Sequence, residues 1–239
     1  MIGLLEPVKS IQPRPTASEG PRLMYLRSYL FMRVMAGVIG ISLPIVLVLV
    51  DRVLFSGDPA PRSSLSAYYY SGVRELFVGA LCAAAMFLVT YKVVELNLDN
   101  TVTVVAGVAA LTIALFPTEA PNGIALTPLQ DLLGETAVSA VHYVAAAAFI
   151  LALAAMSYFF GLREGAREPR PGHRSPLFWR WYHWTCAGVI LLAVAFMAIA
   201  SLVGEPPRAL LYGEAISLWA FGASWLMKGL ELDMLFGTE

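Results

Sequence analysis

Six stretches of the chain are long and apolar enough to cross a lipid bilayer as helices, and this feature constrains the fold most strongly. A spanning helix needs about 20 apolar residues, because hydrocarbon offers no hydrogen-bond partner to a free backbone N–H or C=O group. The third run is short and has an alternative start near Leu96. The runs cover residues 29–50, 73–91, 101–116, 136–160, 181–203 and 211–227. We therefore predict an all-α fold, a polytopic integral membrane bundle of about six transmembrane helices.

The composition agrees with lipid as the solvent for much of the surface. Hydrophobic residues make up 58% of the chain and charged residues 14%, against roughly 45–50% and roughly 25% in soluble domains. The net charge of −1 provides no basis for nucleic-acid binding. The bilayer is thus the expected partner, with specific lipids or other membrane subunits as further candidates.

The membrane region divides the chain into three parts. Residues 1–28 are rich in proline and basic side chains, and we expect a cytosolic arm with little structure of its own. Residues 29–229 form the predicted transmembrane domain, and residues 230–239 a short cytosolic tail. The apolar run after the arm is long enough to span and does not resemble a signal peptide.

The distribution of Lys and Arg predicts the orientation, because short cytoplasmic loops carry an excess of both. With the N-terminus inside, twelve of the sixteen basic residues lie at the inner ends of the helices and four at the outer ends. The four outer residues are Arg52, Arg62, Arg74 and Arg208. We therefore expect both termini in the cytoplasm.

Polar side chains from four of the predicted helices or their ends meet at the outer face. Ionisable groups at membrane depth are costly and often functional. A histidine beside a carboxylate could also transfer protons. The alternatives are an Arg74–Glu75 ion pair at the interface, an aromatic belt of tyrosines, and a hydrogen-bonded packing role for His142. The candidate ligand-binding residues are Ser64, Ser66, Tyr69, Arg74, Glu75, Thr118, His142 and Glu214.

The inner ends of the helices are rich in aromatic and basic residues. The run from Phe178 to Trp184 is typical of an interfacial anchor, with rings at head-group depth and cations outside. The loop from Arg163 to Arg180 carries five arginines, which would attract anionic lipid at about 1 kcal/mol each. We interpret this layer as structural anchoring, with a lipid or partner site as the alternative.

No motif predicts a cofactor or metal. The sequence has no phosphate loop, dinucleotide fingerprint or nucleophile elbow. Its three histidines, His142, His173 and His183, are scattered between the two predicted membrane faces, which disfavours zinc and bis-histidine haem. We expect no cofactor and no metal.

Several short stretches carry a resemblance to known proteins: residues 64–69, 73–79, 114–118, 141–143, 218–222 and 224–229, together with Glu214. They resemble a family of uncharacterised bacterial multi-pass membrane proteins of the domain-of-unknown-function kind. That family is distantly similar to the FRAG/DRAM/SFK group of eukaryotic membrane proteins. The resemblance implies a six-helix bundle in the bacterial cytoplasmic membrane and implies no reaction. The layout is also loosely similar to that of alkaline ceramidases, but this chain lacks their His-x-x-x-His pattern.

Four functions remain open from the sequence, of which a transporter is disfavoured because broken helices and midplane charges are not clear here. The other three are as follows. The first is a non-enzymatic membrane protein whose polar extracytoplasmic pocket binds a lipid or small ligand or docks a partner. The second is an accessory or structural subunit of a larger membrane complex. The third is a lipid-modifying enzyme that uses His142 and Glu214 as acid–base groups with Ser64 or Ser66, which requires hydrogen-bond distances of about 2.6–3.2 Å or one bridging water.

Overall fold

The computed structural model describes residues 19–56, 60–90, 98–169, 174–204 and 206–229, and every regular element in these ranges is helical. The long helices are accompanied by a π-helical segment, η1, a 3-10 helix, η2, and the short helix α4. The elements are α1 (Glu19–Val50), η1 (Asp51–Ser56), η2 (Ser66–Tyr70), α2 (Arg74–Thr90), α3 (Leu98–Leu115), α4 (Pro128–Leu133), α5 (Glu135–Gly165), α6 (Pro176–Val203) and α7 (Ala209–Gly229). The all-α prediction is confirmed.

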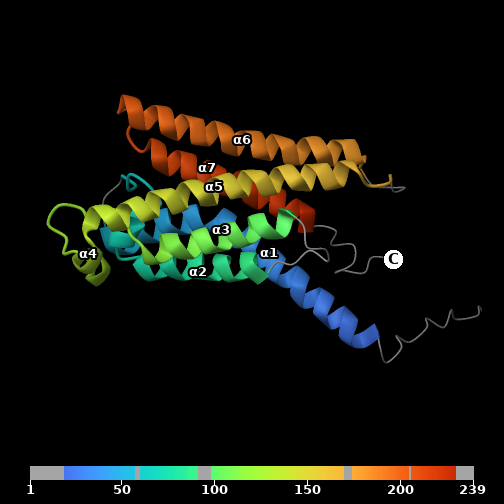
Figure 1. The fold of residues 1–239 in the computed structure, drawn as a ribbon, viewed down its shortest axis with the longest axis horizontal. Helices are drawn as coiled ribbons and strands as arrows, with labels where there is room; N and C mark the ends of the chain where they lie inside the picture. The colour runs from blue at the N-terminus through green and yellow to red at the C-terminus, as the bar shows by residue number, and fades with distance from the viewer. Residues whose placement is uncertain (1–18, 57–59, 91–97, 170–173, 205, 230–239) are drawn as a thin grey trace, which may run out of the picture.

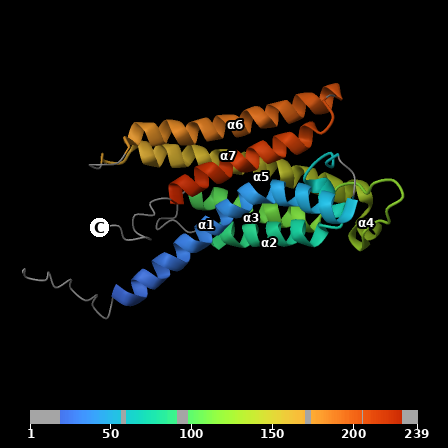
Figure 2. The ribbon, with the colours of Figure 1, turned by 180° about the vertical axis from the view of Figure 1, so that it is seen from behind.

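Six long helices run along one common direction as a bundle (Figures 1 and 2). Helix α5 contacts α3, α6 and α7, while α2 packs against α3 and α1 packs against α7. The first turns of α1 lean away from the other helices (Figure 2). Helix α1 begins and α7 ends on the same side of the bundle, and α4 lies at the opposite end (Figure 1). We call that opposite end the α4 end.

Local sequence signals account for the ends of α6. The Ser175 side chain accepts a hydrogen bond from the Phe178 N–H, and Pro176 occupies the first turn, where its missing N–H costs nothing. At the other end Gly204 adopts a left-handed conformation (φ 78°) that favours glycine, and its N–H caps the Ala200 carbonyl.

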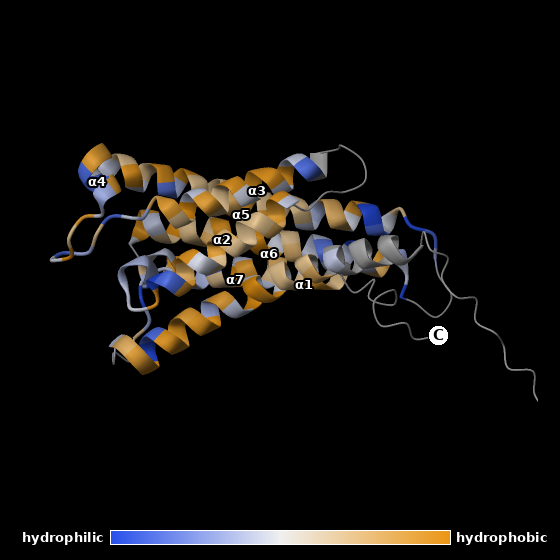
Figure 3. Ribbon diagram, turned by 90° about the horizontal axis from the view of Figure 1, so that it is seen from below, coloured by the Kyte–Doolittle hydropathy of each residue, from blue (hydrophilic) through white to orange (hydrophobic). Residues whose placement is uncertain are grey.

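Among the described residues, three helices are long and apolar enough to cross a membrane by length and composition: Val34–Ser56, Glu135–Gly165 and Pro176–Val203. Asn100–Leu115 is a shorter apolar helix. Hydrophobic residues dominate the middle of the bundle and hydrophilic ones gather near its ends (Figure 3). These helices support insertion into a membrane.

The helix boundaries correct the expected N-terminal arm. Helix α1 begins at Glu19, so residues 19–28 are helical, although the prolines and charges of this stretch predicted little structure. The apolar pattern placed the start of the first helix at Tyr29, because the continuous apolar run begins there and Arg22 and Arg27 interrupt the residues before it. Residues 1–18 and the tail 230–239 lie outside the described residues.

Small residues bring α2 and α3 into close contact. A Cβ atom placed on Gly107 would lie 2.8 Å from the Ala85 carbonyl oxygen and 2.5 Å from a methyl carbon of Val89. Backbones approach closely where side chains are small, which is the main route to tight packing between helices in lipid.

The aromatic run that begins α6 has one exposed and one buried side. Trp181 is exposed, whereas His183 is buried and its Nδ1 atom lies 2.8 Å from the Ser224 hydroxyl of α7. The Arg180 guanidinium donates to the Gly165 carbonyl at 3.2 Å, which joins the start of α6 to the end of α5. These contacts are structural ones between helices.

Candidate functional site

Residues 60–73 fold over the α4 end of the bundle and are attached to the start of α7 by three hydrogen bonds. The Arg208 Nε–H donates to the Pro61 carbonyl at 2.8 Å, and the Leu211 N–H donates to the Ser63 carbonyl at 3.1 Å. The Leu65 N–H donates to the Glu214 carboxylate at 2.6 Å. This attachment places η2, which begins at Ser66, against the interior of the helix bundle.

His142 links this segment to two long helices. Its Nδ1 atom lies 2.7 Å from the Phe116 carbonyl oxygen, just beyond α3, and its Nε2 atom lies 3.0 Å from the Ser66 hydroxyl. A carbonyl oxygen only accepts, so Nδ1 carries the hydrogen in the neutral ring and Nε2 accepts from Ser66. The imidazole of α5 is buried and is fixed in orientation by both bonds.

A cavity of about 250 Å³ lies next to this histidine, between α5, α6 and α7. Its apolar wall is formed mainly by α5 and α6, with Ile150 and Met197 among the lining side chains. The polar lining consists of Ser64, Ser66, Thr118, His142, Tyr143, Ser201 and Glu214. Glu214 is the single Asp, Glu, Lys or Arg in this lining.

The basic residues nearest in sequence to the polar lining are bound elsewhere. The Arg62 guanidinium pairs with the buried Asp51 carboxylate at 3.1 Å, and Arg208 is held by the Pro61 carbonyl. The cavity lining therefore has one acidic side chain and no lysine or arginine. Its electrostatics favour a neutral or cationic group over an anion.

A second polar layer covers the α4 end above the cavity. The Tyr70 hydroxyl donates to the Thr118 carbonyl at 2.6 Å. The side-chain amide of Gln130 donates to the Tyr70 hydroxyl oxygen at 2.9 Å and to the Thr118 carbonyl oxygen at 3.0 Å. Burial raises the pKa of Tyr70 above its usual value, so the phenol stays protonated and donates. Gln130 also completes a capping box with Thr127 at the start of α4.

The structure brings together five of the eight residues that the sequence predicted for this site. These five, Ser64, Ser66, Thr118, His142 and Glu214, line the cavity. The other three do not line it. Arg74 donates to the Tyr69 hydroxyl and lies 4.2 Å above the centre of its ring, while the Glu75 side chain is exposed.

His142 and Glu214 both line the cavity, and they are hydrogen-bonded to two adjacent residues of one loop. His142 contacts Ser66, and Glu214 accepts from the N–H of Leu65. His142 is thus hydrogen-bonded to Ser66, one of the two serines in the enzyme alternative, and the Phe116 carbonyl orients this pair.

Sequence reasoning missed four contributors to the site. The Phe116 carbonyl and the Leu65 N–H are backbone groups, which leave no signal in the sequence. Ser201 lies inside an apolar run and is recognised only through its place in the cavity wall. Gln130 had a usable signal, because Thr-x-x-Gln is a capping-box pattern that predicts the helix α4.

Comparison with known proteins adds no assignment. No family model, no curated protein and no solved structure matches this chain.

Proposed function

We propose that this chain is a six-helix membrane protein that binds a lipid head group or a small polar ligand in the cavity at its α4 end. The observation that carries the proposal is the convergence of polar groups from separate elements around one 250 Å³ space. Burying such groups costs free energy unless each is hydrogen-bonded, and selection for a ligand site accounts for their retention in an apolar bundle.

The six-helix arrangement is part of the same proposal. Helices α2 and α3 have 17 and 18 residues, or about 26 Å at 1.5 Å per residue, slightly less than the roughly 30 Å of a bilayer's hydrocarbon core. Helix α7 has 21 residues. The charge distribution then places both termini in the cytoplasm and the cavity on the extracytoplasmic side. By resemblance, the membrane is a bacterial cytoplasmic membrane.

A cavity-filling variant tests ligand binding. Ala147 of α5 lines the cavity, so Ala147→Phe should exclude the ligand, whereas Val144→Phe adds the same ring to the exposed side of α5. Each protein would be purified from its native membrane in lipid nanodiscs and its bound molecules identified by mass spectrometry. We expect a molecule that copurifies with the original protein and with Val144→Phe and is lost in Ala147→Phe. No such molecule, or equal recovery with Ala147→Phe, would reject the proposal.

The Ser66–His142 pair favours a second candidate, an ester hydrolase acting on a membrane amphiphile. Nucleophile and base lie 3.0 Å apart, and the Phe116 carbonyl orients the base. The Ser66 oxygen would attack the ester carbonyl carbon while His142 Nε2 takes the hydroxyl proton. His142 would then return that proton to the leaving alkoxide, and water would release the acyl group from Ser66.

A fluorophosphonate probe, which forms an O–P bond with an activated serine and releases fluoride, tests the hydrolase. We expect labelling of the original protein and of Ser64→Ala, and loss of labelling in Ser66→Ala. An unlabelled original protein rejects the hydrolase and leaves ligand binding intact. The accessory-subunit alternative has no observation in its favour, because the exposed apolar side chains of α6 are equally expected to face lipid.

A further inference from the structure

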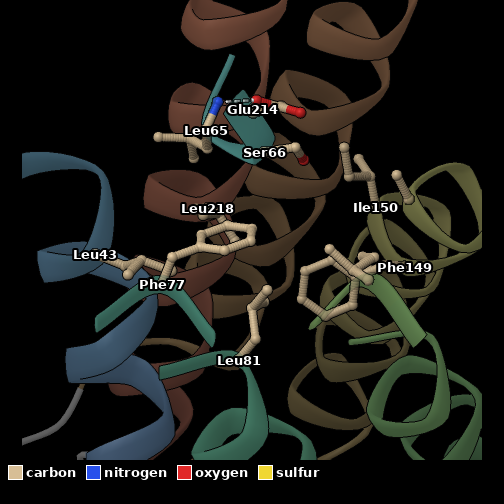
Figure 4. A pocket seen from close by; sticks show the side chains of 11 residues that line it. Leu43, Leu65, Ser66, Phe77, Leu81, Phe149, Ile150, Glu214 and Leu218 are labelled. Atoms are coloured by element: carbon tan, nitrogen blue, oxygen red, sulfur yellow. Dashed lines mark hydrogen bonds between the residues drawn. The ribbon is translucent and has the colours of Figure 1, made fainter. Parts of the chain in front are cut away.

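Two smaller cavities continue inward from the polar one. The first, of about 50 Å³, shares four lining residues with the 250 Å³ cavity: Ser66, Ala146, Ile150 and Glu214. Figure 4 shows Glu214 and Ser66 at one end of this space and the apolar side chains of Phe77, Phe149 and Leu81 beyond them. The polar groups thus lie at one end of a space with otherwise apolar walls.

The second cavity, of about 30 Å³, lies deeper still. It shares Leu43, Leu81, Phe149 and Leu218 with the first and adds Ala84 and Phe221 among other residues. From Glu214 to Phe221 along α7, the rise of 1.5 Å per residue corresponds to about 10 Å. Three adjacent cavities therefore extend from a polar end towards the middle of the bundle.

The wall of the polar cavity that faces outward is also apolar. Leu151 of α5 and Leu210 of α7 are 48% and 41% exposed and line its edge. In a bilayer these side chains face the lipid, so a molecule with a hydrocarbon chain can reach the cavity sideways without crossing water.

Building on the proposed ligand-binding function, we propose that the ligand is a single-chain amphiphile with a non-anionic, hydrogen-bonding head group. The head, an amine or a hydroxyl, lies among Glu214, Ser64 and Thr118. The hydrocarbon chain passes Phe77 and Phe149 and ends beside Ala84. An anionic head such as a phosphate is disfavoured, because the lining has no lysine or arginine to neutralise it.

Affinity should depend on chain length if the deep cavities receive the chain. Each buried methylene strengthens binding about fourfold. Because Ala84→Phe fills the deepest space, it should weaken binding of a long chain and spare a short one. Met86→Phe is the matched control, since Met86 lies on the exposed side of the same helix.

The experiment uses the full chain in phosphatidylcholine nanodiscs, with butylamine and hexadecylamine as competitors of a photoreactive, clickable hexadecylamine. We expect crosslinks to Leu81 or Phe149, competition by hexadecylamine and hexadecanol, and none by hexadecyl phosphate. In Ala84→Phe hexadecylamine should lose at least tenfold in affinity, and butylamine, whose chain is too short to reach Ala84, should change less than twofold. Crosslink positions in the original protein test the chain's location even if Ala84→Phe fails to fold.

The outcomes separate the two proposals. Absence of saturable binding for every amine and alcohol overturns the further inference, and the copurification experiment decides the proposed function on its own. Saturable binding with crosslinks only at the cavity edge, or equal affinity for hexadecyl phosphate, overturns the single-chain, non-anionic assignment and leaves a ligand-binding cavity in place.

Discussion

The Ser66 hydroxyl and the Nε2 atom of His142 lie 3.0 Å apart in space and 76 residues apart in sequence. This hydrogen bond joins the loop before α2 to the interior face of α5. The Phe116 carbonyl on the other ring nitrogen joins the end of α3 to the same side chain. One imidazole therefore holds together three elements around the cavity.

Replacing Ser66 by alanine should destabilise the fold, because it leaves the buried Nε2 atom of His142 without its partner. The expected loss is about 1–3 kcal/mol in the free energy of unfolding, measured by denaturant titration in detergent. Ser201→Ala is the control: Ser201 lines the same cavity but donates to the Met197 carbonyl of its own helix. Its expected cost is within about 0.5 kcal/mol, and equal losses in the two variants would contradict the linking role of Ser66.

Glu214 should tolerate glutamine better than alanine. The amide oxygen of Glu214→Gln can still accept from the Leu65 N–H, whereas Glu214→Ala leaves that N–H unpaired. We expect the free energy of unfolding of Glu214→Ala to be about 1–3 kcal/mol lower than that of Glu214→Gln, as measured by thermal and chemical unfolding. If both variants lose the same amount, the carboxylate does not hold the loop through this bond.

Gln130 should control the local stability of the layer above the cavity. Gln130→Ala removes the donor to the Tyr70 and Thr118 oxygens and the capping box of α4. Hydrogen exchange of the amides between residues 118 and 134 should accelerate, while α5 and α6 keep their protection. Asp131→Ala, an exposed change in the same helix, should leave exchange unchanged, and faster exchange throughout the bundle would contradict a local role.

The contact between α2 and α3 predicts a difference between two glycines. Gly107→Ala places a methyl group 2.8 Å from the Ala85 carbonyl oxygen and should cost about 1–3 kcal/mol of unfolding free energy by overpacking. Gly79→Ala, with no atom within 4 Å of the added carbon, should be neutral or slightly stabilising because alanine favours the helix. A neutral Gly107→Ala in the unfolding assay would mean that the two helices separate easily.

Hydrophobic pattern predicted much of this fold, and the reasons for its failures are physical. The apolar runs predicted the positions of six helices. In a membrane helix the side facing lipid and the side facing the bundle are both apolar, so the run of apolar residues along the sequence is continuous. The start of α1 at Glu19 was missed because Pro21, Arg22 and Arg27 interrupt the apolar residues of this stretch and give no continuous signal. Helix α4 was missed because six residues are too few for a periodic pattern.

The site was only partly predictable for a related reason. The predicted topology alone placed Ser66, His142 and Glu214 at one end of the bundle, because it assigned alternate helix ends to opposite sides. The same rule also selected Arg74, which instead binds Tyr69. Which polar groups at one end share a cavity depends on helix rotation and on backbone groups such as the Phe116 carbonyl, and neither is encoded in residue type.

The most direct test of the account is a labelling experiment with a membrane-impermeant thiol reagent on intact cells. Single cysteines would replace Thr90, Asn122 and Glu168, all exposed, in a chain whose Cys82 and Cys186 are changed to alanine. Six spans predict labelling at position 122 in intact cells, and labelling at positions 90 and 168 only after permeabilisation. Equal labelling at positions 90 and 122 in intact cells would show that α2 and α3 do not cross the membrane, and the six-helix account would fail.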